Sequence, residues 1–166
     1  MKNIVQKTKM TIKAQDLRLI VYDFDGVMTD NRVLVFSDGR EAVFCNRADG
    51  LAVAGIKAMG IPQIVLSTEK NEVVAARARK LKLKVIQGVV NKRTALVRYC
   101  RQKKIELNRV VYIGNDVNDL ETMRIVGFPL CPADANANVK RISRGVIAQK
   151  GGEGVIKYFY DRILKF

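Results

Sequence analysis

Six short apolar runs recur along the chain, and segments of helix length separate most of them. The runs are "RLIVYD" (18–23), "QIVLS" (63–67), "KVI" (84–86), "RVVYIG" (109–114), "FPL" (128–130) and "GVIA" (145–148). They show no alternation of apolar and polar residues, which is typical of strands that are buried on both faces. We therefore predict six strands in a mostly parallel sheet.

The segments between the runs have the periodicity of helices. Residues 49–60 start at Asp49, a candidate N-cap, and stop at Gly60. Residues 71–81 and 91–104 each carry one apolar face, and residues 154–166 repeat an apolar pair every four positions, which predicts a strong helix. Strands that alternate with such helices predict an α/β fold with a Rossmann-like, doubly wound parallel sheet.

One segment departs from this alternation. After the first strand, "VLVF" and "EAVFC" flank "SDGR", which is typical of a small β-hairpin with its turn at Asp38-Gly39. We see no internal repeat, no low-complexity linker and no second domain. We expect an N-terminal extension of residues 1–16, to which we assign no function, and a single domain of residues 17–166.

The composition suits a globular domain in a reducing compartment. The chain has 166 residues, 48% of them hydrophobic, enough to bury roughly two-thirds of the unfolded surface. Cys45, Cys100 and Cys131 form no CxxC pair, so we interpret them as small buried hydrophobes. No apolar run approaches the roughly 18 residues of a membrane span, and the first 17 residues lack the core of a signal peptide. We expect a cytoplasmic protein without a membrane partner.

The chain is strongly basic, with a net charge of +14 and basic clusters at residues 77–84, 98–104 and 139–144. These clusters fall on separate predicted helices and match no nucleic-acid-binding motif. We favour solvated helix faces, then steering of a small anionic substrate, and last nucleic-acid binding.

Several classes of chemistry are excluded by missing residues and motifs. Histidine is absent, which removes histidine nucleophiles, bases and metal ligands. No cysteine is followed six positions later by arginine, and neither GxxxxGK[ST] nor GxGxxG occurs. Chemistry in this chain therefore depends on carboxylates, hydroxyls and lysine.

Such groups follow the predicted strands. The first strand ends in "DFDG", the second in "STEK" and the fourth in "GNDVND", while "VVNKR" follows the third. Asp23 and Asp25 are two residues apart and point the same way in extended backbone. A cation relieves the repulsion of two such carboxylates, and Mg²⁺ accepts oxygen ligands. With a lysine nearby, this set suits phosphoryl transfer.

The four motifs together resemble those of the haloacid dehalogenase superfamily of aspartate-nucleophile phosphatases. The resemblance rests on "LIVYDFDGVMTDNRV", "LSTEK", "VVNKRTA" and "YIGNDVNDLETM", and it covers about residues 17 to 165. The closing "KGGEGVIKYF" is similar to the tail of the small-cap sugar-acid phosphatases. These act on the 8-phosphate of 3-deoxy-manno-octulosonate, or on the 9-phosphate of ketodeoxynononate or sialic acid. The C-terminal module of some acylneuraminate cytidylyltransferases is similar as well.

The resemblance implies a role for each strand-end residue. Asp23 would form an aspartyl phosphate, and Asp25 would protonate the leaving oxygen and then activate water. Ser67 would hydrogen-bond the phosphoryl group, and Lys92 would neutralise its charge. Mg²⁺ would bind Asp23, the backbone carbonyl of Asp25 and Asn115. Asp116 or Asp119 would restore through a bound water the charge that asparagine lacks.

The same resemblance implies substrate contacts and partners. The hairpin, residues 32–45, and the tail, residues 150–154, would complete the site of a neighbour in a homotetramer. Where octulosonate enzymes carry Thr-Gly-Arg and the nine-carbon group Thr-Gly-Glu-Lys, this chain has Ser67-Thr68-Glu69-Lys70, which favours a nine-carbon sugar acid. Candidate contacts for its carboxylate or phosphate are Thr68, Glu69, Lys70, Arg47, Arg77 and Lys80.

Two other interpretations remain open. A response-regulator receiver domain also combines an acidic pair, a hydroxyl and a lysine, but its phosphorylated aspartate should end the third strand, where this chain has Ile86-Gln87-Gly88. The stronger alternative is a catalytically weak or silent domain that assembles a tetramer alongside a sugar-acid cytidylyltransferase. Silent domains share Asn115, whereas active phosphatases share Asp23 and Asp25.

Overall fold

The computed structural model describes residues 10–165, which are built around a six-stranded parallel sheet with the order β6-β5-β2-β7-β8-β9. Its strands are β2 (Leu19–Tyr22), β5 (Gln63–Leu66), β6 (Lys84–Ile86), β7 (Val110–Ile113), β8 (Phe128–Cys131) and β9 (Gly145–Val146). Each falls within a predicted apolar run or extends it by one residue. The α/β fold with a mainly parallel sheet is therefore confirmed.

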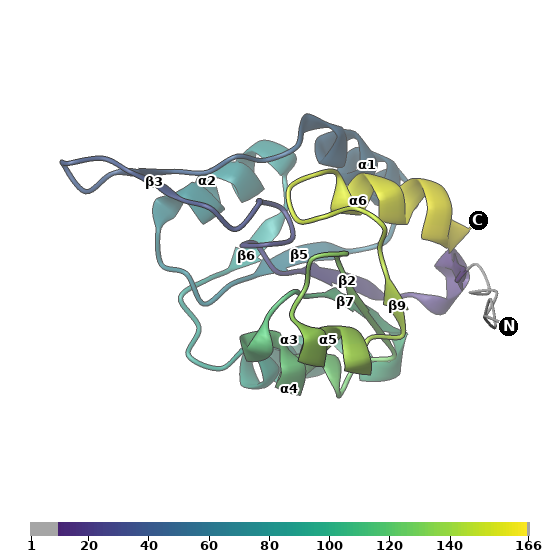
Figure 1. Ribbon diagram of the computed structural model, residues 1–166. Coiled ribbons are helices and arrows are strands. Elements are labelled where there is room, and N and C mark those ends of the chain that lie inside the picture. Colours follow the sequence, from purple (N-terminus) through teal and green to yellow (C-terminus); the bar gives the residue numbers. More distant parts are fainter. Residues whose placement is uncertain (1–9, 166) are drawn as a thin grey trace, which may run out of the picture.

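Helices cover both faces of the sheet (Figure 1). They are α1 (Arg47–Ala58), α2 (Glu72–Leu81), α3 (Lys92–Lys103), α4 (Leu120–Met123), α5 (Ala137–Ile142) and α6 (Val155–Tyr158). Residues Ile20 and Tyr22 of β2 pack in the cluster that contains α1, α2 and α6, while Leu19 and Val21 pack with α3, α4 and α5. Adjacent residues of β2 thus face opposite layers, as the period of a strand requires.

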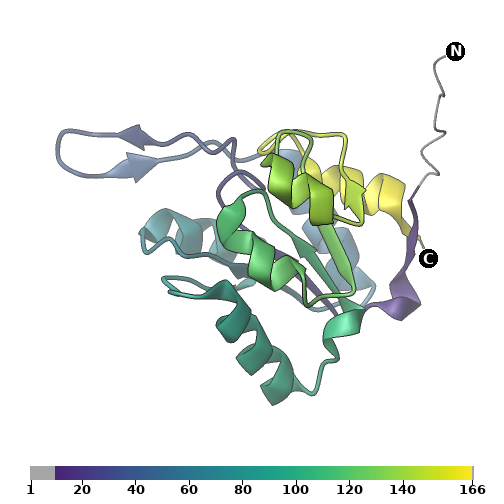
Figure 2. The same cartoon turned by 60° about the horizontal axis from the view of Figure 1, so that its bottom comes forward.

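The predicted hairpin is present and extends away from the two helical layers (Figure 2). Strands β3 (Leu34–Val35) and β4 (Glu41–Ala42) pair antiparallel, and Gly39 in the turn has φ +85°, a conformation that glycine adopts without strain. Apolar side chains on it are exposed, including Leu34 (54%), Val35 (61%) and Phe44 (73%). A two-stranded hairpin of this kind is marginally stable by itself, so these side chains are suited to contact another surface.

Two sequence predictions about helix ends were wrong. Helix α1 begins three residues before the expected start at 50, and its N-cap is Asn46, whose side chain accepts a hydrogen bond from the Ala48 amide. Asp49 lies inside the helix, is buried, and accepts a hydrogen bond from the Lys157 amide of α6. The carboxylate therefore caps a helix that is remote in sequence rather than its own.

The C-terminal helix is also shorter than its periodicity predicts. Helix α6 changes to a π-helical turn at Phe159–Ile163 and then to a short strand, β10 (Leu164–Lys165). Strand β10 pairs in parallel with β1 (Ile12–Lys13), and Ile12 is only 2% exposed. Part of the expected N-terminal extension thus packs on the domain; residues 1–9 lie outside the described part of the chain, and the boundary at residue 17 stays a prediction.

No helix within residues 10–165 is long and apolar enough to cross a membrane. Of the three cysteines, Cys100 and Cys131 are buried, Cys45 is half-buried, and all three are free thiols. This agrees with their interpretation as small hydrophobes.

Candidate active site

The candidate site lies at the carboxyl ends of the central strands. The chain runs outward from β2 through β5 to β6 and then returns to the other side of β2 as β7, so the strand order reverses beside β2. Loops that leave parallel strands at such a point diverge and form a crevice. Asp23 follows β2, Ser67 follows β5 and Asn115 follows β7, so the sheet brings these three groups together.

These residues line a small cavity of about 140 Å³. Its lining includes Asp23, Asp25, Ser67, Thr68, Asn115 and Asp116, all of which were predicted site residues, together with Asn31, Val117 and Asn118, which were not. Lys92 reaches the same place from the first turn of α3 by its contact with Asp23.

A buried ion-pair network forms the floor of the site. The Lys92 ammonium, whose side chain is 1% exposed, donates hydrogen bonds to Asp23 Oδ1 and to Asp119 Oδ1, each at 2.7 Å. Burial, followed by the charge of Asp119, raises the pKa of Asp23 to about 8 although Lys92 opposes the shift. Burial by itself lowers the pKa of Lys92, but the two carboxylates outweigh it and the net shift is upward. One cation thus serves two buried carboxylates.

Asp119, which the sequence suggested only as an alternative to Asp116 for supplying charge through a bound water, is part of this network. It is fully buried; Oδ1 also accepts a hydrogen bond from the Tyr112 hydroxyl at 2.6 Å, and Oδ2 accepts from the amides of Asn115 and Asp116. Asp119 therefore fixes both Lys92 and the backbone of the loop after β7. Its spacing of four residues from Asn115 in "NDVND" was the available signal, because that spacing closes a tight turn.

A tight turn after β2 presents Asp25 to the cavity. Gly26 has φ +78°, and the hydroxyl of the buried Thr29 accepts hydrogen bonds from the amides of Gly26 and Asn31. Burial, followed by the charge of Glu69, raises the pKa of the Asp25 carboxyl. A carboxyl group whose pKa is raised holds a proton nearer neutral pH, as a general acid must.

Asn115 lies directly over this turn. A Cβ atom added to Gly26 would lie 1.9 Å from Asn115 Nδ2, so only glycine admits the carboxamide at this position. The neighbouring Asp116 is exposed, and its Oδ1 accepts a hydrogen bond from the Val117 amide. Within residues 10–165, no group of three or more His, Cys, Asp or Glu side chains could hold a metal ion. A site here would depend on the amide oxygen of Asn115.

The donor set nevertheless fits a divalent cation of the Mg²⁺ type. Asp23 would supply a carboxylate oxygen, Asp25 its backbone carbonyl oxygen and Asn115 an amide oxygen, all of which are hard ligands. The raised pKa of Asp23 shows that Lys92 offsets only in part the burial and the charge of Asp119, both of which disfavour the ionised carboxylate. A cation beside Asp23 would restore that charge balance.

The loop after β5 is held by local hydrogen bonds. Ser67 is buried, and its Oγ accepts from the Glu69 amide at 3.0 Å. Glu69 Oε1 in turn accepts from the amides of Lys70 and Asn71, while the carbonyl of Lys70 accepts from Gln87 Nε2. The carboxylate of Glu69 thus shapes the loop, with Thr68 exposed at the cavity wall.

Three predicted substrate contacts lie elsewhere. Arg77 donates from Nη2 to the carbonyl of Asn46, and Lys80 is exposed on α2. Arg47 lines a second cavity of about 530 Å³, which the tail residues 150–153 and the base of the hairpin also border. The structure does not bring these three cations to the Asp23 cavity, and their role as substrate contacts stays a prediction.

The chain is similar to known hydrolases over most of its length. A family model for haloacid dehalogenase-like hydrolases matches residues 58–159. The structure also resembles that of a Streptomyces avermitilis MA-4680 protein assigned to the HAD family hydrolases. The TM-score is 0.91 at 44% identity, with 95% of this chain and 90% of that chain covered.

The names of two further relatives state a substrate. The structure of 3-deoxy-D-manno-octulosonate 8-phosphate phosphatase from Moraxella catarrhalis, in complex with magnesium, phosphate and KDO, matches with a TM-score of 0.83 and 30% identity, over 87% of this chain and 83% of that chain. The enzyme of the same name from Haemophilus influenzae is 27% identical over 157 residues, which are 94% of this chain and 87% of the relative.

Proposed function

The chain belongs to the haloacid dehalogenase-like hydrolases, among their sugar-acid phosphatases, and on this premise we propose that it hydrolyses the phosphate monoester of a 3-deoxy-2-ulosonic sugar acid. The carrying observation is the buried bridge from Lys92 to Asp23 beside a cavity that also contains Asp25 and Ser67. These groups are a nucleophile, an acid, a hydroxyl donor and a cation within one crevice.

In the first half-reaction, a carboxylate oxygen of Asp23 attacks phosphorus, and the bond from phosphorus to the sugar oxygen breaks. Asp25 donates a proton to that leaving oxygen. In the second half-reaction, Asp25 takes a proton from a water whose oxygen attacks the aspartyl phosphate, and the bond from phosphorus to Asp23 breaks. Both steps transfer one proton through Asp25, which suits a half-buried carboxyl with a raised pKa.

Two further side chains stabilise the charge that the phosphoryl group develops. The Ser67 hydroxyl donates to a phosphoryl oxygen, and Lys92 orients Asp23 through its bridge and favours its ionised form. Asp23, the backbone carbonyl of Asp25 and Asn115 would hold Mg²⁺, with Asp116 acting through a bound water. Mg²⁺ supplies charge neutralisation at the phosphoryl oxygens.

For the substrate, we propose an eight- or nine-carbon sugar acid. The relatives named for 3-deoxy-D-manno-octulosonate 8-phosphate support the eight-carbon acid. The Glu69 loop motif favoured the nine-carbon acid, but its carboxylate is occupied by backbone amides. A direct comparison of the 8-phosphate with the nine-carbon 9-phosphates decides between them.

We also propose that the chain works as a homotetramer. Its hairpin exposes Val33, Leu34, Val35, Phe36 and Phe44, and such an apolar patch on a projecting element is typical of an interface. The second cavity, bordered by Arg47 and Lys150, is open in the single chain and would be closed by a neighbour. Light scattering of the wild type and of Phe44→Asp tests this assembly.

The decisive experiment for activity is phosphate release during a Mg²⁺ titration of the wild type, Asp23→Asn and Asn115→Asp. We expect turnover in the wild type at elevated Mg²⁺, none in Asp23→Asn, and a lower Mg²⁺ requirement in Asn115→Asp, because the new carboxylate adds charge to the metal site.

A second candidate function is supported by Asn115 itself. If the wild type were inactive at saturating Mg²⁺ while Asn115→Asp turned over, the chain would be a silent assembly domain. Its proposed partner would then be a sugar-acid cytidylyltransferase.

A further inference from the structure

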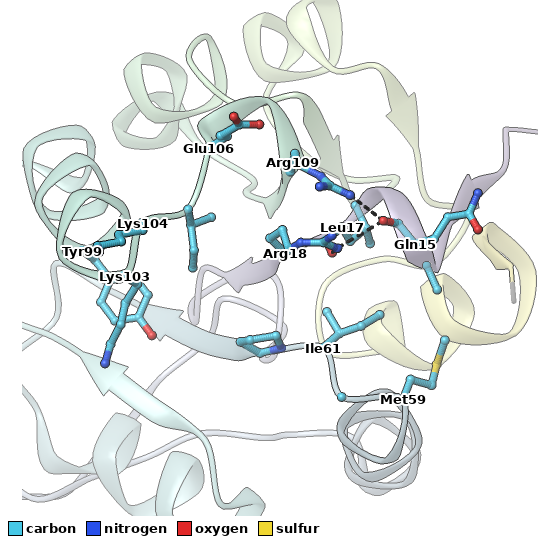
Figure 3. A pocket seen from close by; sticks show the side chains of 14 residues that line it. Gln15, Leu17, Arg18, Met59, Ile61, Tyr99, Lys103, Lys104, Glu106 and Arg109 are labelled. Carbon is cyan, nitrogen blue, oxygen red and sulfur yellow. Dashed lines mark hydrogen bonds between the residues drawn. The ribbon is translucent and has the colours of Figure 1, made fainter.

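A third pocket lies at the opposite edge of the sheet, where the strands begin. It has a volume of about 970 Å³ and is bordered by the segment before β2, the turn between α1 and β5, and the end of α3 (Figure 3). Arg18 immediately precedes β2 and Asp23 immediately follows it. The four residues of β2 lie between them, and five steps of strand rise span about 16 Å, so this pocket is distinct from the candidate active site.

Two guanidinium groups in the pocket are held in place by backbone carbonyls. Arg18 Nη1 donates to the carbonyls of Gln15 and Leu17 at 3.2 and 2.9 Å. Arg109 Nε donates to the carbonyl of Asp16 at 3.1 Å, and its Nη2 donates to that of Gln15 at 2.5 Å. Figure 3 shows both side chains converging on Gln15. Their remaining N–H groups form a preorganised set of donors, because a guanidinium group carries five.

The positive charge of the pocket is largely uncompensated. Arg18, Arg109, Lys103 and Lys104 line it, whereas Glu106 is the only acidic side chain among its described lining residues. Within residues 10–165, none of these four cations forms a salt bridge. An anion would therefore gain charge-assisted hydrogen bonds without displacing a carboxylate.

The rest of the wall is apolar. Leu17, Met59, Ile61, Pro62, Tyr99 and Ile105 contribute to it. Cavities of roughly 300–1,000 Å³ with mainly apolar walls and a few polar anchors are typical of small-molecule sites. Inorganic phosphate by itself would leave this apolar wall uncovered.

We propose that this pocket binds an organic phosphate, with its phosphate groups on Arg18, Arg109 and Lys104 and its organic part against Ile61 and Pro62. Arginine suits this task because its planar fork matches phosphate geometry. A nucleoside diphosphate combines two phosphates with a flat organic part and has a size suited to the cavity. ADP is therefore the probe of choice.

Two lysines with nearly the same backbone conformation provide a matched pair of test and control positions. Lys104 is the C-cap of α3 and Lys82 is the C-cap of α2, and both adopt the left-handed conformation, with φ 55° and 56° respectively. Glycine at either position removes one positive charge and relieves the same backbone strain. Lys104 lines the pocket and Lys82 does not. The two substitutions thus differ in one respect, their distance from the proposed ligand.

The test is isothermal titration calorimetry of the full chain with ADP, pyrophosphate and adenosine, in EDTA so that the catalytic edge carries no metal. We expect Arg18→Gln to weaken ADP binding about tenfold and Lys104→Gly about fivefold, whereas Lys82→Gly leaves it unchanged. Pyrophosphate and adenosine should each bind more weakly than ADP. Thermal melting of every variant verifies folding, and Lys104→Gly keeps the test decisive if Arg18→Gln does not fold.

Three results would each overturn the proposal. The first is absence of ADP binding at millimolar concentration, and the second is equal weakening by Lys82→Gly and Lys104→Gly, which would indicate only general charge attraction. The third is binding of pyrophosphate or adenosine as tight as that of ADP, which would refute the organic phosphate as the ligand class.

Discussion

Replacing Lys92 by methionine should destabilise the fold far more than the loss of an ordinary surface ion pair. Lys92 is the cation of a buried network: its side chain is 1% exposed, and those of Asp23 and Asp119 are 6% and 0% exposed. Methionine preserves most of the volume but removes the charge. Both carboxylates then stay buried without their counter-ion, which is the costly outcome when one partner of a buried pair is lost.

The size of the effect follows from burial. Breaking a buried pair typically costs about 3–5 kcal/mol of unfolding free energy. The matched control is Lys157→Met, because Lys157 pairs with Asp161 across one turn and both side chains are more than a third exposed. An exposed pair of this spacing contributes only about 0.3–0.5 kcal/mol. The two variants make the same chemical change and differ in burial.

Urea unfolding in EDTA at pH 8 and pH 5 measures both variants. We expect the deficit of Lys92→Met to narrow at pH 5. Without the lysine, the pKa of Asp23 rises further, and a protein whose buried carboxyl has a raised pKa in the folded state regains stability as the pH falls. If Lys92→Met lost no more stability than Lys157→Met, or if its deficit were the same at both pH values, the buried network would not be the source of stabilisation.

Three further predictions concern other parts of the fold. Burial raises the pKa of Asp49 to about 6. The contribution of its protonated carboxyl to the free energy of unfolding is therefore complete below pH 4 and is lost as the pH rises through 6. Between pH 4 and pH 7.5, the free energy of unfolding of the wild type, measured with urea, should therefore fall by up to about 3 kcal/mol relative to that of Asp49→Asn. The same pH dependence of stability in both proteins would contradict this. Gly151→Ala should lower kcat, because the new Cβ would lie 2.3 Å from the Gly26 carbonyl oxygen in the turn beside Asp25; a kcat equal to that of the wild type would contradict this. Phe44→Asp should lower the oligomer mass in light scattering without lowering secondary structure in circular dichroism, whereas an unchanged mass would count against the hairpin interface.

Much of the fold could be predicted because its signals are local. Each sheet strand coincides with a continuous apolar run, and Asn71 and Asn91 stand as N-caps immediately before the helices that their sequences indicate. The candidate site followed from the same reasoning, since parallel strands deliver their last residues to one edge. Asp23, Asp25, Ser67 and Asn115 could be listed before any coordinates were known.

Other features required long-range contacts. The last residues follow a helical period, yet Leu164 and Lys165 form a strand, because the first described segment offers Ile12 and Lys13 as pairing partners. Asp49 has the sequence position of an N-cap, but burial against α6 assigns it to another helix. Neither outcome is visible in a local pattern, since each depends on groups more than 100 residues apart.

The residues alone are enough to place a carboxylate, a hydroxyl or a lysine after each of several strands, to exclude histidine chemistry and to identify the asparagine at position 115. The sharing of Lys92 between Asp23 and Asp119 could not be read in this way, and neither could the convergence of Arg18 and Arg109 on the pocket at the opposite edge of the sheet. Side-chain identity is local, whereas burial and charge pairing arise when distant segments pack together.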